Sequence, residues 1–186
     1  MAIKILVDVP VVPSALKALE AMGKFEFDLI DPPEEVARPL DPPRIAAAEV
    51  MFTTFLPTNS EEMKALKWVQ ISSAGYTQLF DHKLPERGIR ATNGRGCFDV
   101  PIAEWNMAMM VNLARDLRQM LRNQDVAVWD RAAIFQHEIR GMTVGIWGYG
   151  GIGRETARLA RAMGLTVHVL TRQGVGPRGD VYHVPG

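Results

Sequence analysis

The sequence predicts an α/β protein made of two consecutive units, each built around a parallel sheet. Two observations predict this class. Short apolar strands alternate with helices over residues 1–95, and a strand, a glycine-rich turn, a helix and a second strand follow one another over residues 143–170. Strands that alternate with helices at short intervals form parallel sheets covered by helices. We therefore predict two domains, residues 1–95 and 96–186.

The first domain is expected to contain five short strands and three helices. Apolar runs predict strands over 3–7, 25–30, 49–53, 68–71 and 89–92. Proline and capping residues predict helices over 13–22, 44–47 and 59–66, the last one capped by Asn59. Prolines between residues 32 and 43 indicate a loop.

A long helix is expected between the two units. Pro101 suits a first helical position, and the alanine, methionine and leucine residues up to Leu121 favour a helix. Apolar residues occupy nearly every side of it, which predicts burial between domains or subunits. We interpret its methionines as packing residues rather than metal ligands.

The glycines at 148, 150 and 153 form a G-x-G-x-x-G turn between a strand and an amphipathic helix. In a dinucleotide site, the first glycine permits the sharp turn and the second lets the backbone approach the phosphates. The third permits close packing of helix and strand, and the helix N-terminus attracts the anion. An ordinary tight turn is the alternative, but the order of elements favours dinucleotide binding.

The end of the second strand bears on the choice of cofactor. An NAD site usually has an acidic residue about 20 residues beyond the turn, which binds the ribose 2′-hydroxyl. This chain has Thr171 and Arg172 there, with Arg178 as a weaker candidate. A guanidinium can bind a 2′-phosphate, so we favour NADP over NAD; alternatively, Arg172 is a solvated loop residue.

Composition excludes several functional classes. Lys and Arg total 21 and Asp and Glu total 21, so a basic surface for nucleic acid or anionic membranes is not expected. Zinc and EF-hand spacings are absent, so no metal site is predicted. The single Cys97 predicts a reducing, cytoplasmic location.

Four separated motifs together resemble the D-isomer-specific 2-hydroxyacid dehydrogenase family, which includes phosphoglycerate dehydrogenase and glyoxylate/hydroxypyruvate reductase. They are the segments 69–76, 92–96, 102–105 and 141–153. The resemblance covers the whole chain and implies a flavodoxin-like substrate domain, a Rossmann cofactor domain and an active site in the cleft between them. It also implies a homodimer, with residues 123–131 near the subunit contact.

The resemblance implies a role for particular residues. Backbone N–H groups of Ser73, Ala74 and Gly75 would bind the substrate carboxylate, with the nicotinamide close to Ala74. The pyrophosphate would be held by Gly151 and Ile152, and the adenosine ribose would meet Thr171 and Arg172. Thr54, Phe55 and Leu56 would line the substrate side. Thr171 stands where the family often has Asp, which puts NAD in doubt.

No catalytic residue of the family is found in this chain. The family uses an Arg and a His paired with an acidic residue beyond the second Rossmann strand, and none of the four histidines matches that position. His82 and His137 are expected to be exposed, His168 lies in a strand, and His183 lies in a terminal loop. We also expect residues 173–186 to form a loop, leaving a two-stranded Rossmann sheet. The chain is therefore expected to be the N-terminal portion of a longer polypeptide.

Two functions remain open from the sequence. The first is an oxidoreductase that exchanges hydride between NAD(P)H and a small 2-keto or D-2-hydroxy acid, inactive as this chain alone. The alternative is a non-catalytic module that binds NAD(P)H and acts through protein contacts.

Overall fold

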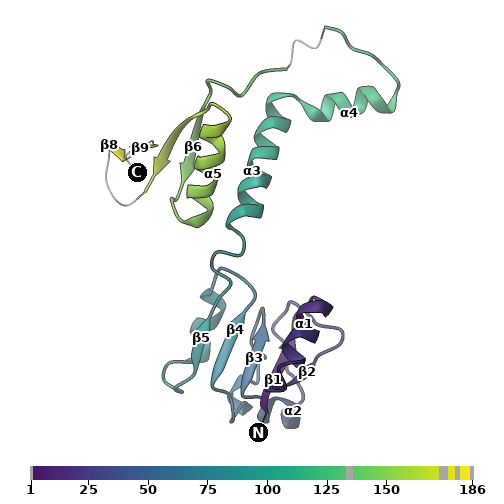
Figure 1. Ribbon diagram of the computed structural model, residues 1–186, viewed down its shortest axis with the longest axis vertical. Helices are drawn as coiled ribbons and strands as arrows, with labels where there is room; N and C mark the ends of the chain where they lie inside the picture. Colours follow the sequence, from purple (N-terminus) through teal and green to yellow (C-terminus); the bar gives the residue numbers. More distant parts are fainter. Residues whose placement is uncertain (1, 133–135, 172–175, 179–180, 185–186) are drawn as a thin grey trace. The chain divides into compact units, whose positions relative to one another are not determined.

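A computed structural model describes residues 2–132, 136–171, 176–178 and 181–184. The chain divides into two compact units, Met1–Arg95 and Gly96–Gly186. Each unit combines a largely parallel sheet with helices (Figure 1), which confirms the predicted α/β class.

A five-stranded sheet forms the first unit. Its strands are β1 (Ile3–Asp8), β2 (Phe25–Leu29), β3 (Val50–Thr53), β4 (Trp68–Ile71) and β5 (Arg90–Thr92). All neighbouring strands pair in parallel, in the order β2-β1-β3-β4-β5. This is the flavodoxin-like order, in which ligands bind beyond the carboxyl ends of the strands, where the order reverses between β1 and β3.

Four helical segments connect these strands: α1 (Pro13–Glu20), α2 (Pro42–Ala46) and the 3₁₀ turns η1 (Ser60–Glu62) and η2 (Thr77–His82). The helix predicted over 59–66 is wrong, because only η1 forms there. The side chain of Asn59 does not cap this turn. Its amide instead bonds the backbone N–H and C=O of Leu40, at 3.0 and 2.9 Å. Asn59 therefore ties two loops together instead of starting a helix.

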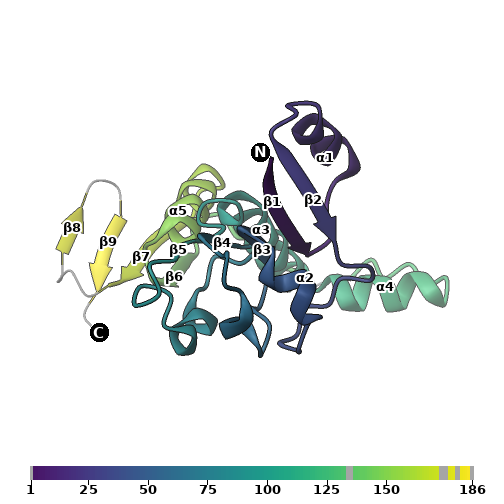
Figure 2. The same ribbon diagram turned by 90° about the horizontal axis from the view of Figure 1, so that it is seen from below.

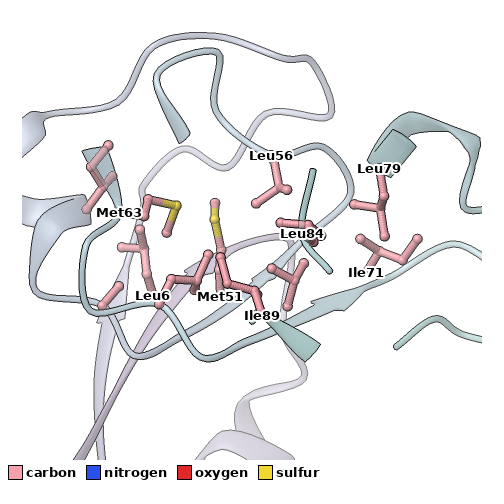
Figure 3. Close-up of a cluster of buried hydrophobic side chains, with 12 residues drawn as sticks. Leu6, Met51, Leu56, Met63, Ile71, Leu79, Leu84 and Ile89 are labelled. Atoms are coloured by element: carbon pink, nitrogen blue, oxygen red, sulfur yellow. The ribbon is translucent and has the colours of Figure 1, made fainter. Parts of the chain in front are cut away.

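The core of the first unit is a cluster of buried apolar side chains that converge from β1, β3, β4 and the connecting segments (Figure 3). Leu6, Met51, Val69 and Ile71 are each at most 1% exposed. Leu56 is also 1% exposed and belongs to this cluster. The expectation that Leu56 lines a substrate site is therefore wrong, because its side chain is part of the core.

An ion pair between the buried carboxylate of Asp8 and the partly exposed Arg38 fixes the proline-rich loop at the carboxyl end of β1. Asp8 is 2% exposed, and its two oxygens accept hydrogen bonds from Nη1 and Nη2 of Arg38, both at 2.9 Å. The backbone N–H of Glu34 also donates to Asp8, at 3.2 Å. These three bonds hold the segment around residues 34–38 against the strand.

The sheet of the second unit has four strands among the described residues. They are β6 (Thr143–Trp147), β7 (Thr166–Leu170), β8 (Gly176–Arg178) and β9 (Val181–Val184). Their order is β6-β7-β9-β8, and β9 pairs with β7 in parallel. Figure 2 shows β8 and β9 extending the sheet beside β7. The prediction of a two-stranded sheet is therefore wrong, and so is the predicted loop at residues 176–178 and 181–184, where strands form and where His183 lies. The rest of the segment 173–186 lies outside the described residues.

The long helix predicted over 101–121 is also corrected. It consists of α3 (Asp99–Ala114) and α4 (Leu117–Asp125). The break falls at Asp116, whose left-handed backbone has a φ of +44° and whose carboxylate accepts from the N–H of Gln119 at 3.2 Å. An Asp in this conformation ends one helix and caps the next.

Helix α3 is less buried in this chain than its apolar sequence predicted. Only Ala103 and Met107 among its residues are buried, while Trp105 is 64% and Leu113 is 82% exposed. Its buried side packs against α5 (Gly151–Ala162), as Figure 1 shows. The core between α3, α5 and the sheet comprises Met107, Ala157, Ala160, Leu165, Val167 and Val169.

No helix among the described residues is both long and apolar enough to cross a membrane.

Candidate functional site

The predicted glycine turn connects β6 to α5 (Figure 1). Gly148, the first residue after β6, has a φ of +97°, which side-chain-bearing residues rarely adopt. Its N–H donates to the carbonyl of Leu170 in the last position of β7, at 3.0 Å. The turn is therefore anchored to the neighbouring strand, and its first glycine is required by the backbone.

Gly153 is required by packing. A Cβ placed on this residue would lie 2.2 Å from the carbonyl oxygen of Gly148 and 3.4 Å from Cγ2 of Ile146. The nearest atom belongs to the backbone, so it cannot move aside as a flexible side chain could. Glycine at 153 thus lets α5 approach the turn and the strand closely, as the motif predicts.

The start of α5 offers donors to an anion. Gly150 precedes the helix with φ −79° and ψ −159°, and no side chain from this position caps the helix. The first helical bond runs from the N–H of Arg154 to the carbonyl of Gly150, at 2.9 Å. The N–H groups of Gly151, Ile152 and Gly153 come before that bond, in the region where a helix attracts negative charge.

A pocket of about 580 Å³ lies over this turn. Its wall includes the turn glycines 148, 150, 151 and 153 together with Ile152, which are five of the predicted cofactor residues. Asn106 of α3 and Thr156 of α5 also line it, and the Asn106 amide donates to the Thr156 hydroxyl at 3.2 Å. The structure therefore brings these predicted residues together in one concave site.

Another predicted cofactor residue, Thr171, lies at the end of β7. Thr171 follows Leu170 directly and is half-buried. The segment Thr166–Thr171 contains no Asp or Glu, so the carboxylate common in NAD sites is absent from that strand end. Arg172 lies outside the described residues.

The predicted substrate loop follows β4 in the first unit. The carbonyl of Ser73 accepts from the N–H of Gly94 at 2.8 Å, and the carbonyl of Ala74 accepts from the amide of Asn93 at 2.7 Å. The Ser73 hydroxyl donates to the carbonyl of Gly75, at 2.8 Å. In the described part of the chain, no hydrogen bond uses the N–H of Ala74 or Gly75. The loop is thus held by its oxygens and retains N–H donors for an anion.

Three further hydrogen bonds hold this loop in place. The amide of Gln78 donates to the Ser73 hydroxyl at 2.8 Å and to the carbonyl of Thr54 at 3.2 Å. The Thr54 and Ser72 hydroxyls are 2.7 Å apart. A Cβ at Gly94 would lie 2.6 Å from the carbonyl oxygen of Ser72, so glycine is required there for the two strand ends to meet. Several hydrogen bonds therefore fix the loop at the carboxyl edge of the first sheet.

None of the histidines whose side chains are described lines the pocket over the glycine turn. His82 is half-buried rather than exposed as predicted, and its Nδ1 lies 2.7 Å from the hydroxyl of Ser60. Burial lowers the pKa of His82, and the nearby Arg87 cation lowers it further. His137 is exposed, and the ring of His168 packs against Tyr182 with centroids 5.6 Å apart.

Sequence reasoning missed the contribution of α3 to the pocket. Asn106 and Met110 line it, and the Asp99 carboxylate lies against Gly151. These residues lie on one face of the helix, at spacings of seven and four residues. This spacing could have indicated that the three residues share one face of the helix, but the apolar sequence of the helix predicted burial instead.

Comparison with known proteins adds to this geometry. Residues 107–182 match the profile of the family described as D-isomer specific 2-hydroxyacid dehydrogenase, NAD binding domain. The chain is 27% identical over 169 residues to D-3-phosphoglycerate dehydrogenase of Methanocaldococcus jannaschii, which covers 89% of this chain and 31% of that protein. It is 30% identical over 107 residues to hydroxypyruvate reductase of Thermotoga maritima, covering 58% of this chain and 35% of that protein.

A solved structure is similar over nearly the whole chain. The NADPH-dependent glyoxylate/hydroxypyruvate reductase of Sinorhizobium meliloti superposes with a TM-score of 0.77 and 25% identity, over 99% of this chain and 58% of that one. The chain thus spans about a third of these two curated relatives and somewhat more than half of the solved structure.

Proposed function

Because this chain belongs to the D-isomer-specific 2-hydroxyacid dehydrogenase family, we propose that it binds a nicotinamide dinucleotide at the glycine turn between β6 and α5. The observation that carries this proposal is the shape of the glycine turn and of the pocket above it. A side chain at 153 would strike the carbonyl of Gly148, and the pocket above the turn is lined by the glycines and by the start of α5. This space and these donors fit a pyrophosphate.

The proposed reaction is hydride exchange with a small 2-keto or D-2-hydroxy acid. The dinucleotide, when bound, supplies or accepts the hydride at its nicotinamide ring. In this proposal, the N–H groups of Gly151 and Ile152 hold the pyrophosphate, and the Ser73-Ala74-Gly75 loop binds the substrate carboxylate. The unused N–H groups of Ala74 and Gly75 support the second assignment, because consecutive backbone donors bind carboxylates well.

The same reaction needs a proton donor and a cation to stabilise the developing alkoxide. We assign neither to this chain, since His82 bonds the hydroxyl of Ser60 and no described histidine lines the pocket over the glycine turn. We therefore propose that the 186 residues bind the dinucleotide but do not turn over a substrate on their own.

We propose NADP as the preferred cofactor. The absence of an acidic residue at the end of β7 supports this choice, because a carboxylate there would repel a 2′-phosphate. Thr171 can donate a hydrogen bond to a phosphate oxygen as well as to a ribose hydroxyl. We also propose a cytoplasmic location, on the basis of the single exposed Cys97.

Titration of the chain with NADPH and NADH tests cofactor binding, with an equal concentration of adenosine as the control for base stacking. The proposal expects both dinucleotides to bind more tightly than adenosine, and NADPH most tightly. Oxidation of NADPH with glyoxylate and hydroxypyruvate should then be absent for this chain. If neither dinucleotide binds better than adenosine, the proposed function is wrong.

A second candidate is a non-catalytic module that binds NAD(P)H and acts through protein contacts. The apolar side chains exposed along α3 and after α4 support it, with Leu113 at 82% and Trp129 at 84% exposed. These exposed side chains also support a homodimer, because large exposed apolar side chains mark protein contacts. Keto acid reduction by a longer polypeptide that contains this chain would favour the dehydrogenase over the module.

A further inference from the structure

The carboxylate of Asp99 lies directly against the first residue of α5. A Cβ placed on Gly151 would be 1.9 Å from Oδ2 and 2.5 Å from Oδ1 of Asp99. Such distances mean that the carboxylate fills the space beside this α-carbon. Asp99 belongs to the first turn of α3, so this contact is made between two different helices.

The position of this carboxylate is favourable in the absence of a ligand. The start of a helix carries a partial positive charge, and no side chain at Gly150 caps α5. A negative charge from Asp99 therefore stabilises the helix start. In the described part of the chain, the Asp99 side chain makes no hydrogen bond or ion pair that would prevent it from rotating away.

The proposed ligand would bring a second negative charge next to this carboxylate. A dinucleotide pyrophosphate bound at this turn takes the N–H groups of Gly151 and Ile152 and carries negative charge of its own. Two anions so close together repel each other, and the repulsion is large where water is partly excluded. Asp99 and the pyrophosphate therefore compete for the start of α5.

We propose that the carboxylate of Asp99 opposes dinucleotide binding. It lies at the start of α5 in the free protein and must move aside when the pyrophosphate binds. This inference rests on the proposed dinucleotide binding. Its consequence is that the chain binds dinucleotides more weakly than its glycine turn alone would allow.

Calorimetric titration with ADP-ribose and with adenosine tests this inference. ADP-ribose carries the pyrophosphate without the nicotinamide, while adenosine lacks the pyrophosphate. The variants are Asp99→Asn and Asp99→Ser, which both remove the charge but differ in hydrogen bonding. Asp125→Asn, an exposed position at the end of α4, is the control for the change in net charge.

Both Asp99 variants should bind ADP-ribose roughly three- to tenfold more tightly, as expected for removal of one like charge a few ångströms away. Adenosine binding should stay unchanged, and the Asp125 variant should match the original chain. The melting temperature without ligand should fall for both Asp99 variants, because the start of α5 loses its anion.

Three results would overturn the inference. Weaker ADP-ribose binding by both variants would make Asp99 a ligand of the dinucleotide instead of a competitor. Unchanged binding would show that the carboxylate does not oppose the pyrophosphate. If the original chain binds ADP-ribose no better than adenosine and the variants do not improve it, the proposed function fails together with this inference.

Discussion

The α-carbon of Gly153 faces the carbonyl oxygen of Gly148 so closely that a Cβ at 153 would lie 2.2 Å from that oxygen. Gly148 itself has a φ of +97°. The first and third glycines of the motif therefore depend on each other: the left-handed turn at 148 places the carbonyl that excludes any side chain at 153. This pair sets the distance between the strand and the helix.

Gly153→Ala is expected to weaken both folding and cofactor binding. The new Cβ must displace the backbone of the turn, and we expect the free energy of unfolding to fall by about 1–3 kcal/mol. The affinity for NADPH should fall by about tenfold or more, because the donors of α5 move with the helix. Urea unfolding and NADPH titration measure the two effects.

Gly150→Ala is the matched control for stability in this experiment. A Cβ at Gly150 meets nothing within 4 Å, and the φ of −79° suits alanine. The Gly150 variant should therefore keep its stability and lose only affinity, because the backbone must approach the phosphates there. Equal unfolding curves for the Gly153 variant and the original chain would contradict the packing argument.

Thr171→Asp is expected to change the cofactor preference. An Asp at the end of β7 would accept a hydrogen bond from a ribose 2′-hydroxyl and repel a 2′-phosphate. The affinity for NADPH should fall about tenfold or more, while that for NADH holds or improves. Thr171→Ser, which keeps the hydroxyl, is the control. An unchanged ratio of the two affinities would mean that the ribose is recognised elsewhere.

The strands and the glycine turn could be predicted because their signals are local. Apolar runs bounded by glycine or proline identify β1 to β5, and the spacing of Gly148, Gly150 and Gly153 identifies the turn before α5. The helix over 59–66 could not be predicted correctly. The conformation of this segment depends on the hydrogen bond between Asn59 and Leu40, which joins residues distant in the sequence.

Strand β9 and the α3 residues near the glycine turn could not be predicted either, because they also depend on contacts between residues distant in the sequence. Strand β9 contains only Val181–Val184 and forms by pairing with β7, so its glycine- and proline-rich surroundings gave no strand pattern. Asn106, which lines the pocket, and Asp99, which lies beside Gly151, both come from α3, and their positions depend on how that helix packs on α5. Such side chains are found from the structure, whereas motif residues are found from the sequence.

Asp8→Ala is expected to destabilise the first unit strongly. This variant leaves the Arg38 guanidinium without its buried partner, and we expect a loss of about 3 kcal/mol or more, typical of breaking a buried pair. Asp28→Ala is the matched control, because Asp28 also binds an arginine, Arg44, through both oxygens, but its side chain is 47% exposed. The control should cost about 1 kcal/mol or less.

Chemical denaturation measures this difference between the two ion pairs. The proline-rich loop should also become more susceptible to proteolysis in the Asp8 variant, because three bonds to it are lost. Similar costs for the buried and the exposed pair would contradict the structural role given to Asp8.

Trp129→Ser is expected to weaken self-association. Trp129 is 84% exposed and lies with Met120 and Val128 around a hollow of about 990 Å³ after α4. A second copy of the chain would bury these side chains, so their removal should shift the sedimentation coefficient toward that of a monomer. Val36→Ser, at a position 55% exposed in the first unit, is the control. A chain that sediments as a monomer before substitution contradicts the homodimer.

His82 should make the stability of the first unit depend on pH. Burial is the main cause that lowers the pKa of His82 from its ordinary value near 6.5; the Arg87 cation adds to this, and Asp81 and Glu61 oppose it. The folded state therefore favours the neutral ring, and below the ordinary pKa the unfolded state binds more protons. The free energy of unfolding should be constant between about pH 8 and pH 7 and fall as the pH drops below about 6.5.

His82→Gln should remove this slope, because glutamine does not titrate and can still bond the hydroxyl of Ser60. His137→Gln, at an exposed ring, should leave the slope as it is. The measurements should stay above about pH 5, where the carboxyl groups of Glu49 and Glu155 remain ionised because Lys67 and Arg158 lower their pKa values. If the His82 variant keeps the full slope, another group is responsible, and the buried contact between His82 and Ser60 does not control the pH dependence.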